Sequence, residues 1–313
     1  MKLFVFGSLA LDELGHFKGC FKDLLQTGSP EKLSLSFIVE EVAESLGGCA
    51  GNVAYGLGLL GCSAVVIGNL GHDGESYAKT LKTWGMDTRF VARSKKYRTA
   101  KATITSDATG AQIAHFNPGA FGEEKAFILP SNAKPNDIFL LGPENKNRMM
   151  EAAQAAKKAH LRLFLDPGQL LHTFSKKELL EWMEGAECLF LNEYEWSLLQ
   201  SKTTLKEKDI LKKVKTLILT HGAIGGTLLQ KEGRFEWAAF PARFVDGTGA
   251  GDAFRAAFLA ALLKGFPFQK AIQWGAILGA AVVESPFAQG YSLTKAQALA
   301  LKKLGWSESK PQP

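Results

Sequence analysis

Short apolar runs alternate along most of the chain with longer stretches in which apolar residues recur every three or four positions. The short runs predict strands buried on both faces at residues 3–6, 64–68, 138–141, 161–165, 188–191 and 217–219. The longer stretches predict helices at residues 52–60, 75–84, 147–160, 176–183 and 204–214. Because strand and helix alternate, we expect crossover units that form a mostly parallel sheet with helices on both faces.

Two segments break this alternation because their apolar residues stand at every second position. In residues 13–44 this spacing is clearest at positions 33, 35, 37 and 39, and in residues 97–116 it flanks a turn-like stretch at 106–110. Period two is typical of half-exposed strands, and the second segment predicts a hairpin. We therefore expect an α/β core at residues 1–12, 45–94 and 119–313, with β-strand inserts at residues 13–44 and 95–118 that form a small lid.

The last third of the chain has a different pattern. Residues 251–264 and 268–283 carry apolar side chains nearly all round and predict two long helices, both buried. Gly265 and Pro267 lie between them, as is typical where one helix ends and the next begins.

Composition and charge exclude several classes of protein. Hydrophobic residues make up 46% of the 313 residues and charged residues 22%, so the chain can bury a large core and is not disordered or fibrous. The net charge of +6 favours anionic ligands, but it forms no basic stripe, and we expect no nucleic-acid partner. No apolar run approaches a membrane span, and the run at residues 3–6 is too short for a signal peptide, so we expect a cytoplasmic protein without membrane contact.

Cysteine spacing gives no sign of a metal site or a disulfide framework. The cysteines at positions 20, 49, 62 and 188 form no C-x-x-C pair and predict free thiols. The histidines also lack the spacing of metal ligands.

One glycine cluster matches a cofactor motif in letters but not in context. Gly56, Gly58 and Gly61 fit the G-x-G-x-x-G pattern of dinucleotide-binding proteins. That pattern has its meaning only after a strand and at the start of a helix, whereas here it ends a predicted helix. Close helix packing and a helix end explain it better, and no P-loop sequence occurs elsewhere.

A second cluster, at residues 246–252, has the context of an anion site. It follows the strand-like pair 244–245 and opens the predicted helix at 251, so its backbone N–H groups and the helix dipole favour a phosphate. Asp252 either stabilises the start of this helix or acts on a ligand. A carboxylate beside an anion site repels phosphate unless it has a task, such as taking a proton from an attacking hydroxyl. We therefore favour Asp252 as a general base.

A third cluster, at residues 47–52, opens an earlier helix in a similar way. Gly47 and Gly48 allow a ligand to approach the backbone, and Asn52 offers both a donor and an acceptor to a polyol. The alternative is a glycine turn with Asn52 as the helix N-cap.

Together these motifs resemble those of the ribokinase-like (PfkB) family of sugar and nucleoside kinases. The first family motif resembles residues 47–61 and 68–74, and the second resembles residues 246–253, with its G-A-G-D core at Gly249–Asp252. The N-x-x-E element is similar to residues 192–195, and the T-x-G-x-x-G element to residues 220–225. All four occur in family order along nearly the whole chain.

Looser similarities point to the bacterial adenosine kinases within this family. They lie at residues 99–107, 116–120, 251–256 and 279–285. Two positions depart from the pattern. Gly247 replaces the usual threonine or proline, and Phe287 falls in the subgroup's G-T-Q stretch, which puts its cation loop in doubt.

The resemblance implies a fold, a reaction and a set of site residues. The fold is a three-layer α/β/α core with a lid, and the reaction moves the γ-phosphoryl of ATP to the 5′-hydroxyl of a nucleoside, adenosine above all, as in purine salvage. The implied catalytic residues are Asp252, as base, and Gly249, Ala250 and Gly251, which form an anion hole. The implied substrate-binding residues are Asp12, Gly47, Gly48, Asn52 and Phe116. The implied nucleotide-binding residues are Asn192, Thr220, Gly222 and Gly225, and Glu195 is implied to hold Mg²⁺ through water.

Several alternatives stay open at this point. Phe116 either stacks on a base or only packs in its hairpin, and Glu195 is either a metal residue or a solvated acid at a helix start. The acceptor is either a nucleoside or a sugar, ribose or a ketohexose. A ligand sensor without catalysis is a more remote alternative, and a dehydrogenase would need the misplaced glycine pattern. The expected partners are ATP and a small-molecule acceptor, with the protein a monomer or a homodimer.

Overall fold

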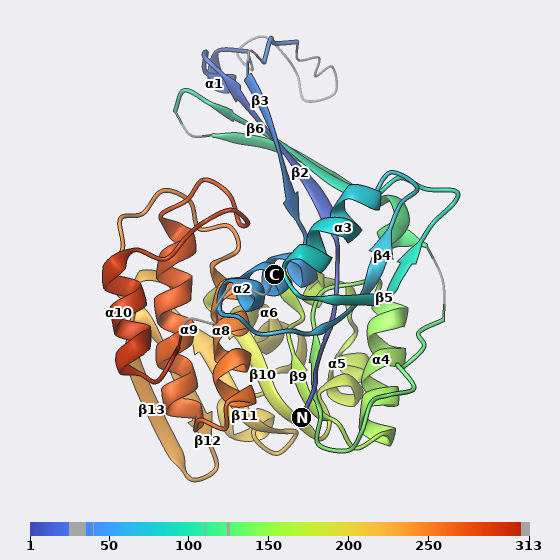
Figure 1. Cartoon of the computed structure of the whole chain (residues 1–313), viewed down its shortest axis with the longest axis vertical. Coiled ribbons are helices and arrows are strands. Elements are labelled where there is room, and N and C mark those ends of the chain that lie inside the picture. The colour runs from blue at the N-terminus through green and yellow to red at the C-terminus, as the bar shows by residue number, and fades with distance from the viewer. Residues whose placement is uncertain (25–35, 40, 110, 124–125, 308–313) are drawn as a thin grey trace.

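The structure is a computed structural model that describes residues 1–24, 36–39, 41–109, 111–123 and 126–307. Its centre is a nine-stranded sheet with the strand order β13-β12-β11-β10-β9-β8-β1-β4-β5. Every neighbouring pair from β11 to β5 is parallel, and β12 and β13 extend one edge as antiparallel strands (Figure 1). The parallel strands end at one edge of the sheet, where ligands bind in α/β folds.

The expected buried strands are all present in this sheet. They are β1 (Leu3–Phe6), β4 (Val65–Leu70), β8 (Ile138–Leu141), β9 (Arg162–Leu165), β10 (Ala186–Asn192) and β11 (Val214–Thr220). The sheet also contains β5 (Asp87–Arg93), β12 (Gly225–Gln230) and β13 (Gly233–Ala238). β5 and β13 are partly exposed and β12, although buried, has only two apolar side chains larger than glycine, Leu228 and Leu229, which is why the apolar pattern did not predict these strands.

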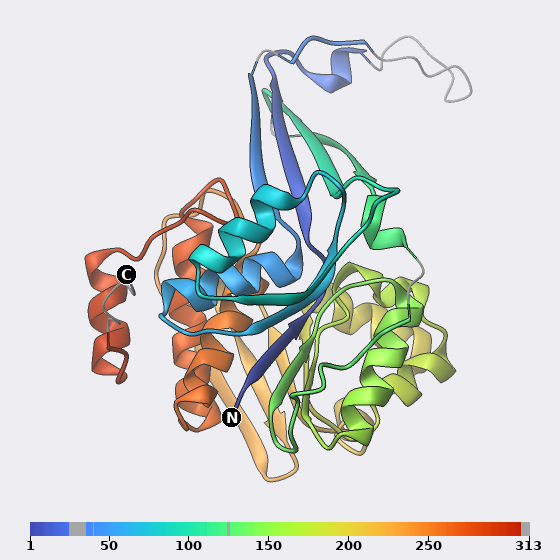
Figure 2. The same ribbon diagram turned by 45° about the vertical axis from the view of Figure 1, so that its right-hand side comes forward.

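Helices cover both faces of the sheet, so the molecule has three layers (Figure 2). One face carries α2 (Cys49–Leu59), α3 (Glu75–Thr83), α8 (Ala250–Leu263), α9 (Phe268–Val283) and α10 (Lys295–Lys303). The other face carries α4 (Lys146–Lys158), α5 (Lys176–Met183), α6 (Glu193–Thr203) and α7 (Glu207–Ile210).

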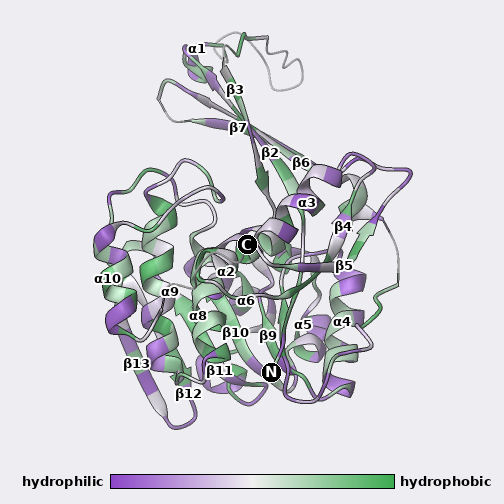
Figure 3. Cartoon of the chain, in the orientation of Figure 1, coloured by the Kyte–Doolittle hydropathy of each residue, from purple (hydrophilic) through white to green (hydrophobic). Residues whose placement is uncertain are grey.

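Alternate side chains of each strand enter opposite cores. In β1, Leu3 and Val5 pack on the α8 side while Phe4 and Phe6 pack on the α4 side, and all four are buried. Green, hydrophobic positions accordingly run through the strands and along the inner helix faces in Figure 3. The pair α8 and α9 is buried most completely, as expected from its apolar pattern.

A second, four-stranded sheet rises above the carboxyl ends of the parallel strands (Figure 1). It consists of β3 (Glu41–Gly47), β2 (Ala10–Phe17), β6 (Ala100–Asp107) and β7 (Gln112–Asn117), in that order, with the one-turn α1 (Phe21–Leu24) at its tip. The predicted hairpin is β6 and β7, and the expected small β lid is confirmed. Phe37 and Val39 lie outside any strand, while Leu33 and Leu35 fall outside the described residues.

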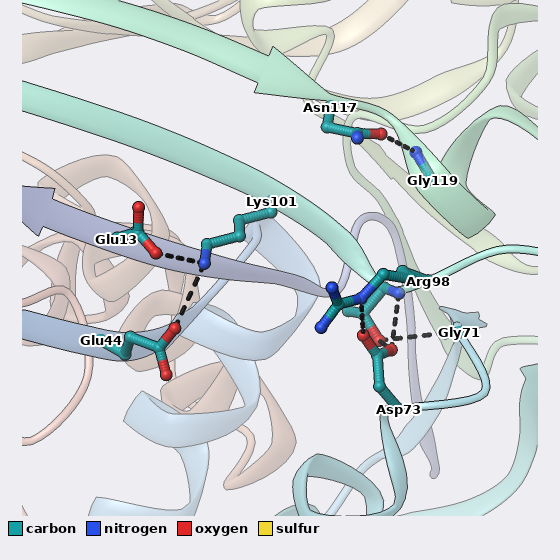
Figure 4. A network of polar contacts seen from close by, with 9 residues as sticks. Glu13, Glu44, Gly71, Asp73, Arg98, Lys101, Asn117 and Gly119 are labelled. Carbon is teal, nitrogen blue, oxygen red and sulfur yellow. Dashed lines mark hydrogen bonds and ion pairs between the residues drawn. The ribbon is translucent and has the colours of Figure 1, made fainter.

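The two faces of this lid differ in character. Ser45, Asp12, Ala102 and Phe116 are paired in one row across the four strands and so share one face. The opposite face, the outer lid face, carries Lys101, which forms ion pairs with Glu13 and Glu44 of the neighbouring strands (Figure 4). Asp12 is thus the charged member of a row of otherwise small or apolar side chains.

The base of β6 is tied to the core by Asp73. Its carboxylate accepts hydrogen bonds at 2.7 Å from the N–H and from the hydroxyl of Thr99, and at 3.0 Å from Arg98 Nε (Figure 4). These bonds lower the pKa of Asp73 to about 2, against the opposing effect of its burial.

The helix predicted at residues 204–214 is wrong in most of its length. Thr204 has a left-handed conformation (φ 62°) that ends α6, α7 covers only part of the segment, and β11 already begins at Val214. The helix α6, which the apolar pattern missed, begins with a capping box in which Asn192 and Glu195 bond each other's backbone N–H groups. No helix among the described residues is long and apolar enough to cross a membrane.

Candidate active site

A cavity of about 720 Å³ opens at the carboxyl edge of the large sheet. Its walls come from the ends of β9, β10 and β11, from the first turn of α8, and from an aromatic strip at residues 237–244. Parallel strand ends and a helix N-terminus therefore meet at one hollow, the arrangement in which α/β proteins bind phosphorylated ligands.

The first turn of α8 has the conformation of an anion site. Gly249 caps the helix with φ 79°, and a Cβ at this position would lie only 2.6 Å from the Cβ of Ala288, so glycine is required. The N–H of Ala250 donates to the carbonyl oxygen of Gly247 at 3.2 Å. The N–H groups of Gly251 and Asp252, at the start of the helix, have no carbonyl partner within it and remain as donors. The N–H of Ala250 differs from these two because it already has an acceptor.

The turn before α8 is held together despite the unusual Gly247. Asp246 Oδ1 accepts the N–H of Thr248 at 2.6 Å, which closes a local turn without threonine or proline at position 247.

Asp252 lies in the first turn of α8 and is 6% exposed. Its Oδ2 accepts a hydrogen bond from Asn52 Nδ2 at 2.8 Å, and its Oδ1 contacts Arg255 Nη2 at 2.8 Å. No side-chain cap bond is present at the start of α8. The carboxylate is therefore oriented by Asn52 of α2 and by Arg255 of its own helix, and it does not cap that helix.

Asn52, which donates to Asp252, also belongs to a buried chain of hydrogen bonds that continues through Gln289 and Tyr77 to Gly47. Gln289 Nε2 donates to Asn52 Oδ1 and to the hydroxyl of Tyr77, each at 2.9 Å, and that hydroxyl donates to the carbonyl oxygen of Gly47 at 2.6 Å. Burial raises the pKa of Tyr77, which keeps this hydroxyl a donor. The interpretation of Asn52 as an N-cap is wrong, because Gly48 (φ 83°) caps α2 and leaves the Asn52 side chain free to face Asp252.

Asp12 enters the same neighbourhood from the lid strand β2. A Cβ on Gly47 of the neighbouring strand β3 would lie 2.2 Å from Asp12 Oδ2, so a side chain at position 47 would force this carboxylate to shift. Burial, and then the negative charge of Asp252, raise the pKa of Asp12 to about 6.

The residues expected on the nucleotide side all line the cavity. These are Asn192, Thr220, Gly222 and Gly225, together with Glu195. Glu195 Oε2 accepts the N–H of Asn192 at 2.9 Å, and the N–H of Glu195 donates to Asn192 Oδ1 at 2.8 Å. Both side chains thus start α6, and the second carboxylate oxygen of Glu195 takes no part in that capping box.

The cavity and its motifs agree with a comparison against protein families. A model of the pfkB family of carbohydrate kinases matches residues 23–295. The chain belongs to this family. The resemblance drawn from the glycine motifs is thereby confirmed.

Relatives within the pfkB family include nucleoside and sugar kinases. The nucleoside kinase of Methanocaldococcus jannaschii is 32% identical over 243 residues, or 76% of this chain and 79% of the relative. Its crystal structure has a TM-score of 0.84 with 28% identity and covers 97% of this chain and 99% of that chain. The fructokinase of Escherichia coli is 27% identical over 235 residues, or 69% of this chain and 76% of the relative.

A second solved nucleoside kinase has a similar structure. The Burkholderia thailandensis enzyme, in complex with inosine, has a TM-score of 0.82 with 31% identity and covers 97% of this chain and 98% of that chain. These structures confirm the expected three-layer fold with its lid.

Six positions singled out in the sequence are not among the described residues that line the cavity: Asp12, Gly47, Gly48, Asn52, Phe116 and Phe287. Phe116 is 50% exposed on β7 and meets Phe121 edge to face at 5.8 Å. Phe287 is half-buried in the loop after α9 and is not among the described residues that line the cavity.

The G-x-G-x-x-G match in α2 serves packing, as expected. A Cβ at Gly56 would lie 2.8 Å from Ala256 on α8, and one at Gly58 would lie 2.8 Å from Trp84. The four cysteines are free thiols.

Sequence reasoning missed four side chains that surround Asp252. Tyr77 and Gln289 belong to the buried chain described above, and Asp166 and Arg255 form an ion pair at 2.7 Å on the cavity side. A charged residue in the otherwise apolar pattern of α8 was the signal for Arg255. An aspartate directly after the buried strand 161–165 was the signal for Asp166.

The resemblance to the pfkB kinases implied that Mg²⁺ is held near Glu195. No group of three or more His, Cys, Asp or Glu residues among those described forms a cage for a metal. Glu195 supplies one oxygen on the cavity wall, which suits Mg²⁺ because this ion keeps several waters and takes its other ligands from phosphates. The donor set therefore fits an ion that arrives with the nucleotide.

Proposed function

We propose that this pfkB-family protein transfers the γ-phosphoryl group of ATP to the 5′-hydroxyl of a nucleoside, with adenosine as the first candidate and AMP as its product. A bond forms between the 5′-oxygen and the γ-phosphorus, and the bond from that phosphorus to the β–γ bridging oxygen breaks. The hydroxyl proton passes to Asp252, and ADP leaves with the bridging oxygen.

The position of Asp252 is the observation that carries this proposal. Its carboxylate is buried, oriented at both oxygens and adjacent to the free N–H donors of the α8 turn. A base and an anion-binding site so close together suit phosphoryl transfer, in which positioning and charge stabilisation supply most of the rate. The N–H groups of Gly251 and Asp252 would contact the oxygens of the transferring group, and Gly249 permits their turn.

The lid supports a nucleoside acceptor. Asp12 would accept hydrogen bonds from the ribose hydroxyls, opposite Asn52 and the Gly47-Gly48 backbone. Phe116 stands in the same row of the lid as Asp12, with the small Ala102 between them, so a planar base has an exposed aromatic face available. The nucleoside kinases among the relatives support the same choice.

On the nucleotide side, Asn192, Thr220, Gly222 and Gly225 would bind ATP. Glu195 would hold Mg²⁺ through water, and the bound ion offsets the charge of the phosphates. A cytoplasmic location fits the free thiols and the need for ATP. As partners we propose ATP and a small-molecule acceptor, with the protein a monomer or a homodimer and without nucleic acid.

Measurement of ADP release tests the proposal. The purified chain is incubated with ATP and magnesium against adenosine, inosine, other nucleosides, ribose and fructose in parallel, and the phosphorylated position is read by phosphorus NMR. Turnover with nucleosides at the 5′-position, and none with free sugars, is the expected result.

The second candidate is a sugar kinase, favoured by the similarity to fructokinase. Turnover with ribose or fructose, and none with nucleosides, would leave Asp252 as the proposed base and would contradict a nucleoside as the acceptor. No turnover with any acceptor, combined with tight ligand binding, would favour a sensor.

A further inference from the structure

Helix α8 carries one arginine whose charge faces the cavity. Arg255 lies three residues after Asp252, and its Nη2 is 2.8 Å from Asp252 Oδ1 and 2.7 Å from Asp166 Oδ2. Side-chain exposure is 15% for Arg255 and 3% for Asp166, so this is a buried network of two carboxylates and one guanidinium. All three residues line the cavity.

Asp166 is fixed in place by the large sheet. It follows β9, its N–H donates to the carbonyl oxygen of Leu141 at 2.9 Å, and its Oδ1 accepts the N–H of Gly168 at 3.0 Å. The remaining oxygen, Oδ2, holds Arg255. The arginine is therefore anchored to a rigid strand end that does not depend on its own helix.

The lack of a side chain at Gly251 leaves room for the guanidinium of Arg255. A Cβ at position 251 would lie 3.1 Å from Arg255 Nη1 and 3.3 Å from Nη2, closer than most side chains tolerate. The guanidinium thus folds back over the first turn of α8 toward Asp252. Burial lowers the pKa of Arg255, but the charges of Asp166 and Asp252 outweigh it and the net shift is upward, so the arginine stays charged.

The charge balance of the cavity depends on this side chain. Among the described residues that line it, Arg255 alone carries a lysine or arginine charge, against the acidic Asp166, Glu195 and Asp252. Without the guanidinium, two buried carboxylates would lie close together unneutralised, and one would take up a proton.

We propose that Arg255, anchored by Asp166, is a positioning residue for the base Asp252. Arg255 holds Oδ1 while Asn52 holds Oδ2, so the carboxylate keeps one orientation and its negative charge, and free lone pairs remain to accept the proton of the acceptor hydroxyl. The identity of that hydroxyl rests on the proposed function, whereas the coupling between Arg255 and Asp252 does not.

Other groups also influence Asp252 and set the background for a pH test. The charged or titratable side chains that interact electrostatically with Asp252 or with its partner Arg255 come from several elements: Asp12 on β2, Cys49 on α2, Tyr77 on α3, Asp166 after β9, Glu195 on α6, Tyr291 in the loop after α9, and Arg255 itself. Arg255 is the cation of this set. Its removal is therefore expected to raise the pH at which Asp252 takes up a proton.

The test compares Arg255→Gln, Arg255→Lys and Asp166→Asn with the unchanged protein, as profiles of kcat against pH from 5 to 9. For Arg255→Gln we expect kcat to fall about 10- to 100-fold, an acid limb at least one pH unit higher, and a nearly unchanged KM for the acceptor. Arg255→Lys keeps the charge and should restore the position of the acid limb and part of kcat. Asp166→Asn should give an intermediate loss, because it frees the arginine without removing it.

A second measurement needs no turnover and separates this inference from the proposed function. With aspartate labelled at the carboxyl carbon, the NMR signal that disappears in Asp252→Asn is followed through a pH titration. A higher midpoint in Arg255→Gln than in the unchanged protein supports the coupling even if no acceptor is phosphorylated. An equal midpoint, or a kcat profile displaced only in height, overturns the proposal. If Arg255→Gln does not fold, the same comparison is made with Asp166→Asn and Arg255→Lys.

Discussion

The two sides of the candidate site are built in different ways. On the core side, Asp252 is buried and each carboxylate oxygen has a hydrogen-bond or ion-pair partner from another residue. On the lid side, Asp12 is half-buried, and all residues of the edge strand β7 are exposed. The groups assigned to proton transfer are therefore held rigidly before a ligand arrives, whereas Asp12 and Phe116, the lid groups assigned to substrate binding, are partly or largely exposed.

This difference indicates that the core is built for catalysis and the lid for selection of the acceptor. Proton transfer and phosphoryl stabilisation lose rate steeply when atoms are misplaced, so they benefit from a buried network in the core. Selection of an acceptor needs access, and a four-stranded sheet above the cavity can close over a bound ligand and exclude water. Substitutions on the core side should accordingly lower kcat, and those on the lid side should raise KM.

The largest effect is expected for Asp252→Asn. Loss of the base should lower kcat by a factor on the order of 10² to 10⁴ while ADP still binds. Steady-state kinetics and calorimetric titration with ADP measure the two quantities. Asp209→Asn, on the surface helix α7, is the control. A kcat close to that of the unchanged protein would remove Asp252 from the mechanism.

Asp12→Asn should act mainly on KM. A lost charged hydrogen bond to a diol costs about 1.5–3 kcal/mol, or roughly a 10- to 100-fold rise in KM at pH 8. Because the pKa of Asp12 is about 6, nucleoside affinity in the unchanged protein should fall about tenfold per pH unit below pH 6, and the variant should lose this slope. Glu13→Gln, the neighbour on the outer lid face, is the matched control and should keep the slope.

The same pKa has a consequence for stability. In the folded protein Asp12 binds its proton more tightly than in the unfolded chain, where the ordinary value is 3.8. Its contribution to stability is therefore present below about pH 4 and is lost as the pH rises through 6. Asp12→Asn should flatten that part of the unfolding free energy against pH, as measured by urea denaturation. If the free energy of unfolding of the variant still declines between pH 4 and 6, the pH dependence arises from a group other than Asp12.

Phe116→Ala should have a smaller effect on the lid side. Loss of stacking on a base costs about 1–3 kcal/mol, so the KM for a nucleoside should rise at least about fivefold. Ile113→Ala, on the same strand and the opposite face, is the control, with 38% exposure against 50% for Phe116. Equal effects of the two substitutions would show that Phe116 only packs in its hairpin.

Lys101→Met should have the smallest effect. The ion pairs to Glu13 and Glu44 lie on the outer lid face, where such pairs contribute under about 1 kcal/mol. Thermal unfolding should shift by a few degrees at most, with kinetics unchanged. A marked rise in KM would show that the outer face also contributes to substrate binding.

The sequence allowed the core and the glycine turns to be predicted better than their tertiary partners. Buried strands such as β1 and β8 reach both apolar cores, and this gives an unambiguous apolar run. Gly249 and Asp252 belong to a local turn, which a short motif specifies. Asp166 and Gln289 join the network around Asp252 only in the folded chain, Asp166 through Arg255 and Gln289 through Asn52, from which it is separated by 237 positions. No local pattern encodes such a meeting.

Where prediction failed, local capping decided the outcome. The segment 204–214 has helical spacing, but Thr204 ends the preceding helix α6, and the last residue of the segment, Val214, already belongs to the strand β11. In the same way, Asn52 has the residue type of an N-cap, yet Gly48 takes that place. Residue type alone does not distinguish a cap from a tertiary contact one turn further along.

The parallel pairing of β2 with β6 also constrains the order of folding. These strands are in register from Ala10 with Ala100 to Phe17 with Asp107, and β4, α3 and β5 lie between them in the chain. Contacts of such long sequence separation form late, because the intervening chain must first be organised. We therefore expect the lid to assemble after the crossover units beneath it, so that a newly made chain closes over ligands only once its core is complete.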